Sequence, residues 1–203
     1  FLMLKNTLLA SALVLTAGSS AFAAQKMTPV RDNGFSYTYG QVAYDRWNLD
    51  HGVDIDALTG EGSFALDEHL FLRGGVSLYD GDFGRGTDLS GNRLYGGLGF
   101  HTPLQQALDL VGSANIVYDR VNPDPGSVQD DMGFELRGGL RNATTDKLEL
   151  SGGLSYLDVG DLEDSDLSLY VQGLVKVSPV VDVGARVLAG DRDTIGVFGR
   201  YNF

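Results

Sequence analysis

Apolar and polar residues alternate with a period of two over most of the chain from residue 35 onward. Successive side chains of a β-strand point to opposite faces, so the pattern predicts strands with one apolar and one polar face. Each segment has about the ten residues that a tilted strand needs to cross a bilayer. The ten predicted strands are 35–45, 56–66, 69–80, 92–101, 107–119, 132–142, 147–157, 166–177, 181–190 and 193–203.

The first and last segments differ in how regular this alternation is. In the last segment Val197 and Phe203 share the apolar face, and Arg200 lies on the opposite face. In the first segment the apolar phase changes after Tyr39. That change predicts a β-bulge at Gly40-Gln41, because one extra residue in a strand reverses the faces that follow it.

The predicted connections alternate between short and long. The short ones lie near Asp67-Glu68, 102–106, 142–146 and 178–180. The long ones lie near 46–55, 81–91, 120–131 and 158–165, and a last, tight one lies at 191–192. Short turns at one end and long loops at the other are typical of outer-membrane barrels, with the short turns in the periplasm.

Charge is distributed unevenly between the two predicted ends. The formal net charge is −12, and the acids concentrate at the long-loop end, to which Asp45, Asp119 and Asp166 are assigned. Trp47 and Tyr44 are predicted to mark the outer membrane interface there, as amphipathic rings do. The acidic balance excludes nucleic acid as a partner, since that requires a basic face.

The polar face of the predicted strands carries both signs of charge. Enclosed charges require partners, so these residues predict an ion-paired, filled lumen. The predicted inward charges are Glu61, Asp109, Glu135, Glu149 and Asp182, with Arg73, Arg93, Arg137, Arg141, Lys176, Arg186 and Arg200.

The first 23 residues have the layout of a secretory signal peptide. Lys5 supplies the positive charge, 8–17 the apolar stretch, and Ala21-Phe22-Ala23 the small residues at the cleavage site. The apolar run is shorter than the roughly 20 residues of a membrane-spanning helix. Residues 24–34 are predicted to form a periplasmic tail and 35–203 the outer-membrane barrel domain. The chain has no cysteine, which excludes disulfides and thiolate metal sites.

Three motifs carry a resemblance to a known group of proteins. They are the Ala21-Phe22-Ala23 site, the opening Phe35-Ser36-Tyr37-Thr38-Tyr39 and the terminal Tyr201-Asn202-Phe203. With them the chain resembles the small outer-membrane barrels grouped with the OmpA-like transmembrane domain, over residues 35–203. The resemblance implies export by the general secretory route and insertion by the barrel assembly machinery, which reads an aromatic-ended last strand.

Acidic pairs near the long-loop end admit a catalytic interpretation. A barrel of ten strands resembles the omptin proteases, whose rim carries an Asp-x-Asp pair and an Asp-x-His pair. This chain has Asp54-Ile55-Asp56 and Asp80-Gly81-Asp82 but no Asp-x-His pair, and Asp50 and His51 are adjacent. A general base must be positioned as well as present, so we favour solvated acidic loops. The acids of 158–166 could likewise bind calcium or bridge to lipopolysaccharide through divalent ions, although solvated loops are again the simpler interpretation.

The sequence thus predicts an all-β, antiparallel up-and-down transmembrane barrel of ten strands in the cell outer membrane. A soluble periplasmic barrel, with its apolar face inward, is the alternative fold. The predicted role is structural or in surface interaction; a narrow pore for small solutes or ions and an omptin-like protease or lipid-modifying enzyme are the alternatives. We assign no catalytic, cofactor-binding or metal-binding residues and expect no cofactor. The expected partners are outer-membrane lipid, lipopolysaccharide and the barrel assembly machinery, with no nucleic acid, and we expect a monomer.

Overall fold

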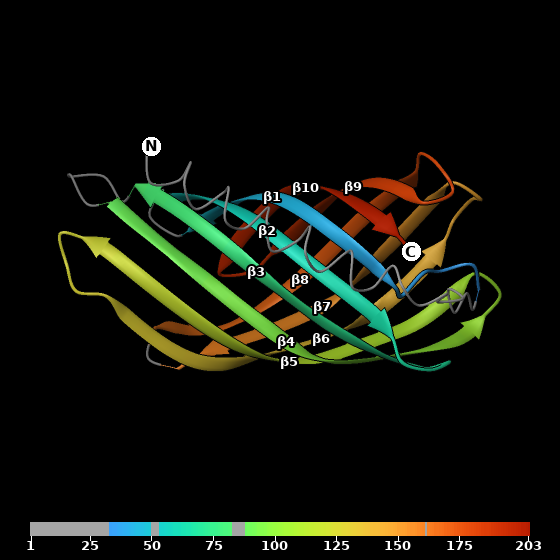
Figure 1. The fold of residues 1–203 in the computed structure, drawn as a ribbon, viewed down its shortest axis with the longest axis horizontal. Helices are drawn as coiled ribbons and strands as arrows, with labels where there is room; N and C mark the ends of the chain where they lie inside the picture. Colours follow the sequence, from blue (N-terminus) through green and yellow to red (C-terminus); the bar gives the residue numbers. More distant parts are fainter. Residues whose placement is uncertain (1–32, 50–52, 83–87, 161) are drawn as a thin grey trace.

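The computed structural model describes residues 33–49, 53–82, 88–160 and 162–203, which form one closed antiparallel barrel (Figure 1). The strands follow chain order around the wall, and β1 pairs with β10 to close it. The ten-stranded up-and-down barrel that the alternation predicts is therefore confirmed. The strands are β1 (Tyr39–Leu49), β2 (Val53–Ala65), β3 (Leu70–Asp82), β4 (Asp88–Gln105), β5 (Leu108–Asp124), β6 (Gln129–Ala143), β7 (Leu148–Val159), β8 (Glu163–Lys176), β9 (Val181–Ala189) and β10 (Arg192–Asn202).

The N-terminal part of the chain is only partly described. The predicted signal peptide, 1–23, and most of the predicted tail, 24–34, lie outside the described residues. Within the described part of the chain, no helix is long and apolar enough to cross a membrane.

The two faces of the wall have opposite polarity, and the apolar face looks outward. Large apolar side chains such as Leu136, Leu154 and Val197 are exposed on the outer surface, at 46, 54 and 58 %. Charged side chains such as Glu61 and Arg200 are buried inside, at 4 and 6 %. A soluble barrel would have the reverse arrangement, so that alternative is wrong. The wall is that of a transmembrane barrel, the kind found in outer membranes.

Inward aromatic rings lie over glycines on the neighbouring strand. Four such cross-strand pairs occur among the described residues, and at each the missing side chain leaves room for the ring. At Gly99, for example, a Cβ atom would overlap the ring of Phe71. The pairs are Phe71–Gly99, Tyr79–Gly91, Tyr95–Gly75 and Phe198–Gly184.

Three of the turns at one end of the barrel share one hydrogen-bonding arrangement. The Asp67 carboxylate accepts hydrogen bonds from the backbone N–H groups of His69 and Leu70, both at 2.7 Å. These bonds lower the pKa of the Asp67 carboxyl group below its ordinary value. The hydroxyl groups of Thr145 and Ser178 accept the equivalent pairs of bonds in the β6–β7 turn and the β8–β9 turn. Asx and Ser/Thr turns of this kind define the strand ends locally.

The predicted long connections at the other end are wrong, because the strands continue through most of them. β1 reaches Leu49 and β2 begins at Val53, while β5 reaches Asp124 and β6 begins at Gln129. At these strand ends the outward face is polar and the inward face carries apolar residues such as Trp47 and Ile55, so the apolar-out, polar-in alternation of a membrane-crossing strand is lost although the backbone ladder persists. At the short-turn end, β4 likewise runs through most of the predicted connection 102–106, to Gln105.

The bulge predicted at Gly40-Gln41 is also wrong. β1 pairs with both neighbours in unbroken register from Tyr39 to Leu49. Phe35 and Tyr37 precede the strand and point inward, like Tyr39. The phase of the segment never changes: Phe35, Tyr37 and Tyr39 lie in the lumen instead of facing lipid, and Tyr44 lies on the outer face.

Candidate functional site: the barrel lumen

A buried carboxylate, Glu61, lies at the centre of the main polar cluster in the lumen. It accepts hydrogen bonds from Arg73 at 2.8 Å, from the Tyr39 hydroxyl at 2.9 Å and from the Tyr95 hydroxyl. Arg73 also lies 3.7 Å from Glu135. These five groups come from different strands, so the cluster cross-links β1, β2, β3, β4 and β6 from the inside.

Further ion pairs lie along the length of the lumen, and the predicted inward charges are confirmed. Arg141 and Lys176 both contact Glu149, at 2.7 and 3.2 Å. Asn202 donates to Asp182, which is also buried. A buried pair is costly to break, because the remaining partner is left as an uncompensated charge.

Three acids assigned to the external acidic end lie inside the barrel, so that assignment is wrong. Asp45 accepts hydrogen bonds from Arg186, and Asp119 accepts them from Arg93. Asp166 accepts one from Ser168 and is 6 % exposed. The reason is the strand extension described above: these positions share the inward parity of their strands, a signal that is present in the sequence.

Two lumenal arginines differ from the others in their partners. Among the described residues, Arg137 and Arg200 have no carboxylate within ion-pair distance. Arg200 donates from Nε and Nη2 to the side-chain oxygen of Gln41, at 3.0 and 2.9 Å. The guanidinium of Arg137 lies over the ring of Tyr170, 4.5 Å from its centre.

The segment before β1 occupies the lumen at the short-turn end. Phe35 is 0 % exposed and packs with Tyr37 and Phe71. The Tyr37 hydroxyl donates to Asp109 at 2.8 Å, and its ring stacks on His101 at 3.7 Å. Residues 35–38, predicted as the start of a membrane-facing strand, instead form part of the interior.

Apolar residues gather inside the opposite end of the barrel. Trp47, Ile55 and Tyr79 form one buried cluster, and Arg192 lies over the Trp47 ring at 4.6 Å. The prediction that Trp47 marks the outer membrane interface is therefore wrong, because its odd-numbered position in β1 faces inward. Tyr44 does face outward.

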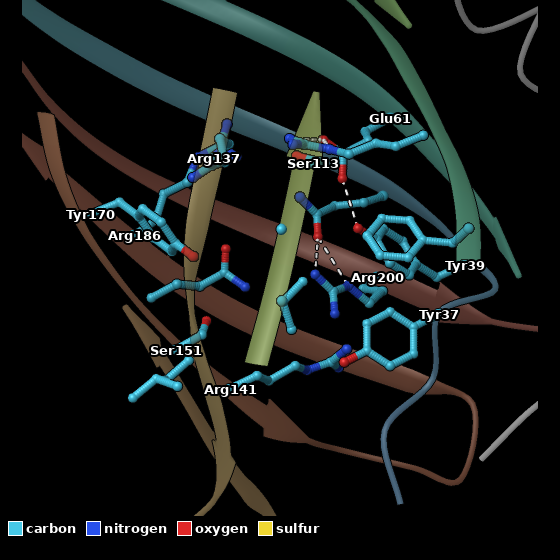
Figure 2. Close-up of a pocket in the computed structure, with 17 residues that line it drawn as sticks. Tyr37, Tyr39, Glu61, Ser113, Arg137, Arg141, Ser151, Tyr170, Arg186 and Arg200 are labelled. Carbon is cyan, nitrogen blue, oxygen red and sulfur yellow. Dashed lines mark hydrogen bonds and ion pairs between the residues drawn. The ribbon is translucent and has the colours of Figure 1, made fainter. Parts of the chain in front are cut away.

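Two cavities remain between these groups. One, of about 110 Å³, lies next to Tyr37 and Tyr39 (Figure 2). The other, of about 100 Å³, lies toward Trp47. Arg73, Arg137 and Arg186 line both, so these three side chains stand between the two spaces.

Of the acidic pairs considered for protease chemistry, Asp54, Asp56 and Asp80 have their side chains on the outside of the wall. Strand pairing places Asp54 opposite Asp82 and Asp56 opposite Asp80. Arg46 pairs with Asp56 at 2.9 Å on this outer surface. His51 lies outside the described residues, and the described histidines, at 69 and 101, are at the short-turn end. The described geometry therefore brings no imidazole to these carboxylates.

The acids considered for calcium binding do not converge where they are described. Asp166 points into the lumen, whereas Asp158 accepts a hydrogen bond from the outward-facing Tyr156. Asp161 and the side chains of Glu163 and Asp164 lie outside the description. In the part of the chain that the structure describes, no group of three or more His, Cys, Asp or Glu residues is arranged to hold a metal ion.

Comparison with known proteins gives distant structural similarities and no sequence relative. No protein-family model and no curated protein matches the sequence. The barrel is similar to neisserial surface protein A, at 14 % identity and a TM-score of 0.48, covering 82 % of this chain and 96 % of that one. The N-terminal barrel of Pseudomonas aeruginosa OprF is similar at 13 % identity and a TM-score of 0.46, covering 82 % of this chain and 98 % of that one. The NanC porin is similar at 7 % identity and a TM-score of 0.46, covering 82 % of this chain and 100 % of that one. Similarity at this level concerns the kind of fold and nothing of the role.

Proposed function

We propose that this chain is an integral outer-membrane protein with a closed lumen, and that its role is structural or in surface interaction and not enzymatic. The observation that carries the proposal is the occupation of the lumen. Ion-paired side chains occupy its middle, residues 35–38 its short-turn end and the Trp47 cluster its other end. Barrels of about eight strands are just wide enough to be filled by side chains, and ten strands are close to that size.

The outer surface supports lipid and lipopolysaccharide as the partners of this barrel. Beyond the apolar band, strand pairing places Asp54, Asp88 and Asp124 in one row across β2 to β5, and the exposed carboxylates of these three residues lie on the outer surface. Such a row would meet the anionic head groups of lipopolysaccharide, which requires bridging divalent cations. Insertion by the barrel assembly machinery remains the expected route into the membrane.

Conductance measurements on the refolded barrel in planar bilayers test the closed lumen. We expect no discrete conductance steps from wild-type protein whose insertion is verified by co-flotation with lipid vesicles. Reproducible steps at a unitary size characteristic of this protein would contradict the proposal.

A narrow pore is the second candidate, and one observation favours it. The two cavities share the side chains of Arg73, Arg137 and Arg186, so only side chains separate them. A pore through this point would favour anions, because cations line it. If the bilayer experiment shows conductance, its reversal potential in a salt gradient should indicate anion selectivity; cation selectivity would exclude this pathway.

A surface role is tested through the row of acids. Thermal unfolding in vesicles that contain lipopolysaccharide should shift to lower temperature when a chelator removes divalent ions. The variant Asp54→Asn/Asp88→Asn should show a smaller chelator-induced shift of its unfolding temperature. The lumenal variant Asp182→Asn is the control: it keeps the outer row of acids and should show the same chelator-induced shift as wild-type protein. No effect of the chelator on wild-type protein would remove bridged lipopolysaccharide as a partner.

A further inference from the structure

The cavity next to Tyr37 has an excess of positive charge on its walls. Five arginines and one glutamate line it. Three of the arginines have carboxylate partners, since Arg73 pairs with Glu61, Arg141 with Glu149 and Arg186 with Asp45. The two remaining cations, Arg137 and Arg200, face the same cavity without one (Figure 2).

An enclosed cation with no carboxylate at ion-pair distance is energetically unfavourable, since burial removes its hydration. The amide oxygen of Gln41 satisfies two N–H groups of Arg200 but supplies no negative charge. Arg137 makes no hydrogen bond to any described residue, and its planar face is held by Tyr170. Its N–H donors are thus available at the edge of a guanidinium that is already oriented.

We propose that this cavity is a binding site for a small oxyanion, a group of the carboxylate or phosphate type, held by Arg137 and Arg200. The planar guanidinium fork matches the spacing of carboxylate and phosphate oxygens, and such charge-assisted bonds are among the strongest in proteins. Ser151 and Gln172 also line the cavity and supply neutral donors. A volume of about 110 Å³ admits a group of several non-hydrogen atoms, since one water needs only about 10–15 Å³ on a comparable measure.

The position of the cavity indicates the side from which such an anion enters. Tyr37, from the segment that occupies the short-turn end, forms part of its wall. The second cavity, which shares Arg73, Arg137 and Arg186 with it, lies on the other side. An anion that enters from the outer end of the barrel would therefore have to pass these three arginines. This inference goes beyond the proposed function and holds whether or not the lumen conducts ions.

Calorimetric titration of the refolded, detergent-solubilised barrel tests the site, with inorganic phosphate and acetate as separate probes. We expect saturable binding of at least one probe at one site per barrel. The variant Arg137→Gln/Arg200→Gln should bind that probe at least tenfold more weakly. The matched control Arg46→Gln removes a cation from the outer surface and should bind like wild type.

Two outcomes would overturn the site: no saturable binding of either probe to wild-type protein, or equal affinity in the lumenal double variant. Gel mobility before and after boiling verifies that each variant is folded. If the double variant fails to fold, Arg137→Lys replaces it, because lysine keeps the charge but loses the fork. Weaker binding by this variant, with Arg46→Gln unaffected, supports the site, and unchanged binding overturns it.

Discussion

At the scale of the residue, the face on which a side chain lies decides what it contributes. Leucine and valine on the outer face contact lipid and do not form a core, whereas arginine and glutamate on the inner face are enclosed and paired. Aromatic residues occur on both faces. Those inside require space, and four glycines on neighbouring strands provide it for Phe71, Tyr79, Tyr95 and Phe198. A side chain of a given type therefore contacts lipid at one position of a strand and is enclosed in the lumen at the next.

Leu136→Arg tests the outward assignment. Leu136 lies at the middle of β6 and is 46 % exposed on the outer surface. A charge at this depth should cost about 2–4 kcal/mol of folding free energy in a bilayer. The measurement is reversible unfolding in lipid vesicles. Asn48→Arg, on the outer face of β1 near its acidic end, is the control and should cost no more than about 1 kcal/mol; equal losses in the two variants would refute the assignment.

Gly99→Ala tests the pairing of inward rings with glycine. The added methyl group would overlap the ring of Phe71 and should destabilise the barrel by about 1–3 kcal/mol, as overpacking does. Gly138→Ala is the matched control, because no atom lies within 4 Å of the added carbon. Its effect should stay within about 0.5 kcal/mol. Denaturant titrations in the same lipid compare the two, and a neutral Gly99→Ala would contradict the packing.

At the scale of the element, the strands extend beyond the apolar band and the segment before β1 folds inward. β4 and β5 have 18 and 17 residues, well above the ten or so that cross the bilayer. Their outer ends carry acids on the outer surface, so the acidic character belongs largely to strands and not to long loops. Residues 35–38 connect to β1 without joining the wall and fill space that wall side chains leave open.

Phe35→Ala tests the contribution of this inward segment. Phe35 is fully buried against Tyr37 and Phe71, and Arg141 lies over its ring at 4.7 Å. Its truncation should lower the free energy of unfolding by about 3–5 kcal/mol. Phe134→Ala, on the lipid-facing side of β6, should cost clearly less. Comparable losses would indicate that the segment does not pack in the lumen.

At the scale of the whole molecule, closure is the defining property. Pairing of β1 with β10 leaves no strand edge in the wall, and inward ion pairs link strands far apart in sequence. Arg186 of β9 and Asp45 of β1, for example, join across β10. Wall and interior thus stabilise one another.

Closure predicts that the protein changes its gel mobility on heating. Unheated wild-type protein in mild detergent should migrate differently from boiled protein, because the closed barrel stays folded. Val197→Pro should abolish the unheated band, since it removes a backbone donor from β10 where the strand pairs on both sides. Val197→Ala keeps the ladder and should retain the band. One mobility for wild-type protein under both conditions would argue against a stable closed barrel.

The alternation along the chain by itself predicted ten strands in up-and-down order and which side chains share a face, because parity is a local property of an extended chain. It also grouped twelve charged residues on the polar face that lines the lumen. The structure then decided between a transmembrane and a soluble barrel, since the apolar face looks outward. Only the tertiary structure decided that residues 35–38 lie inside and which arginines pair with Asp45 and Asp119. These features depend on where each strand leaves the apolar band and on which strands meet across the lumen. Both follow from barrel closure, which brings together residues more than a hundred positions apart, and no local pattern contains that information.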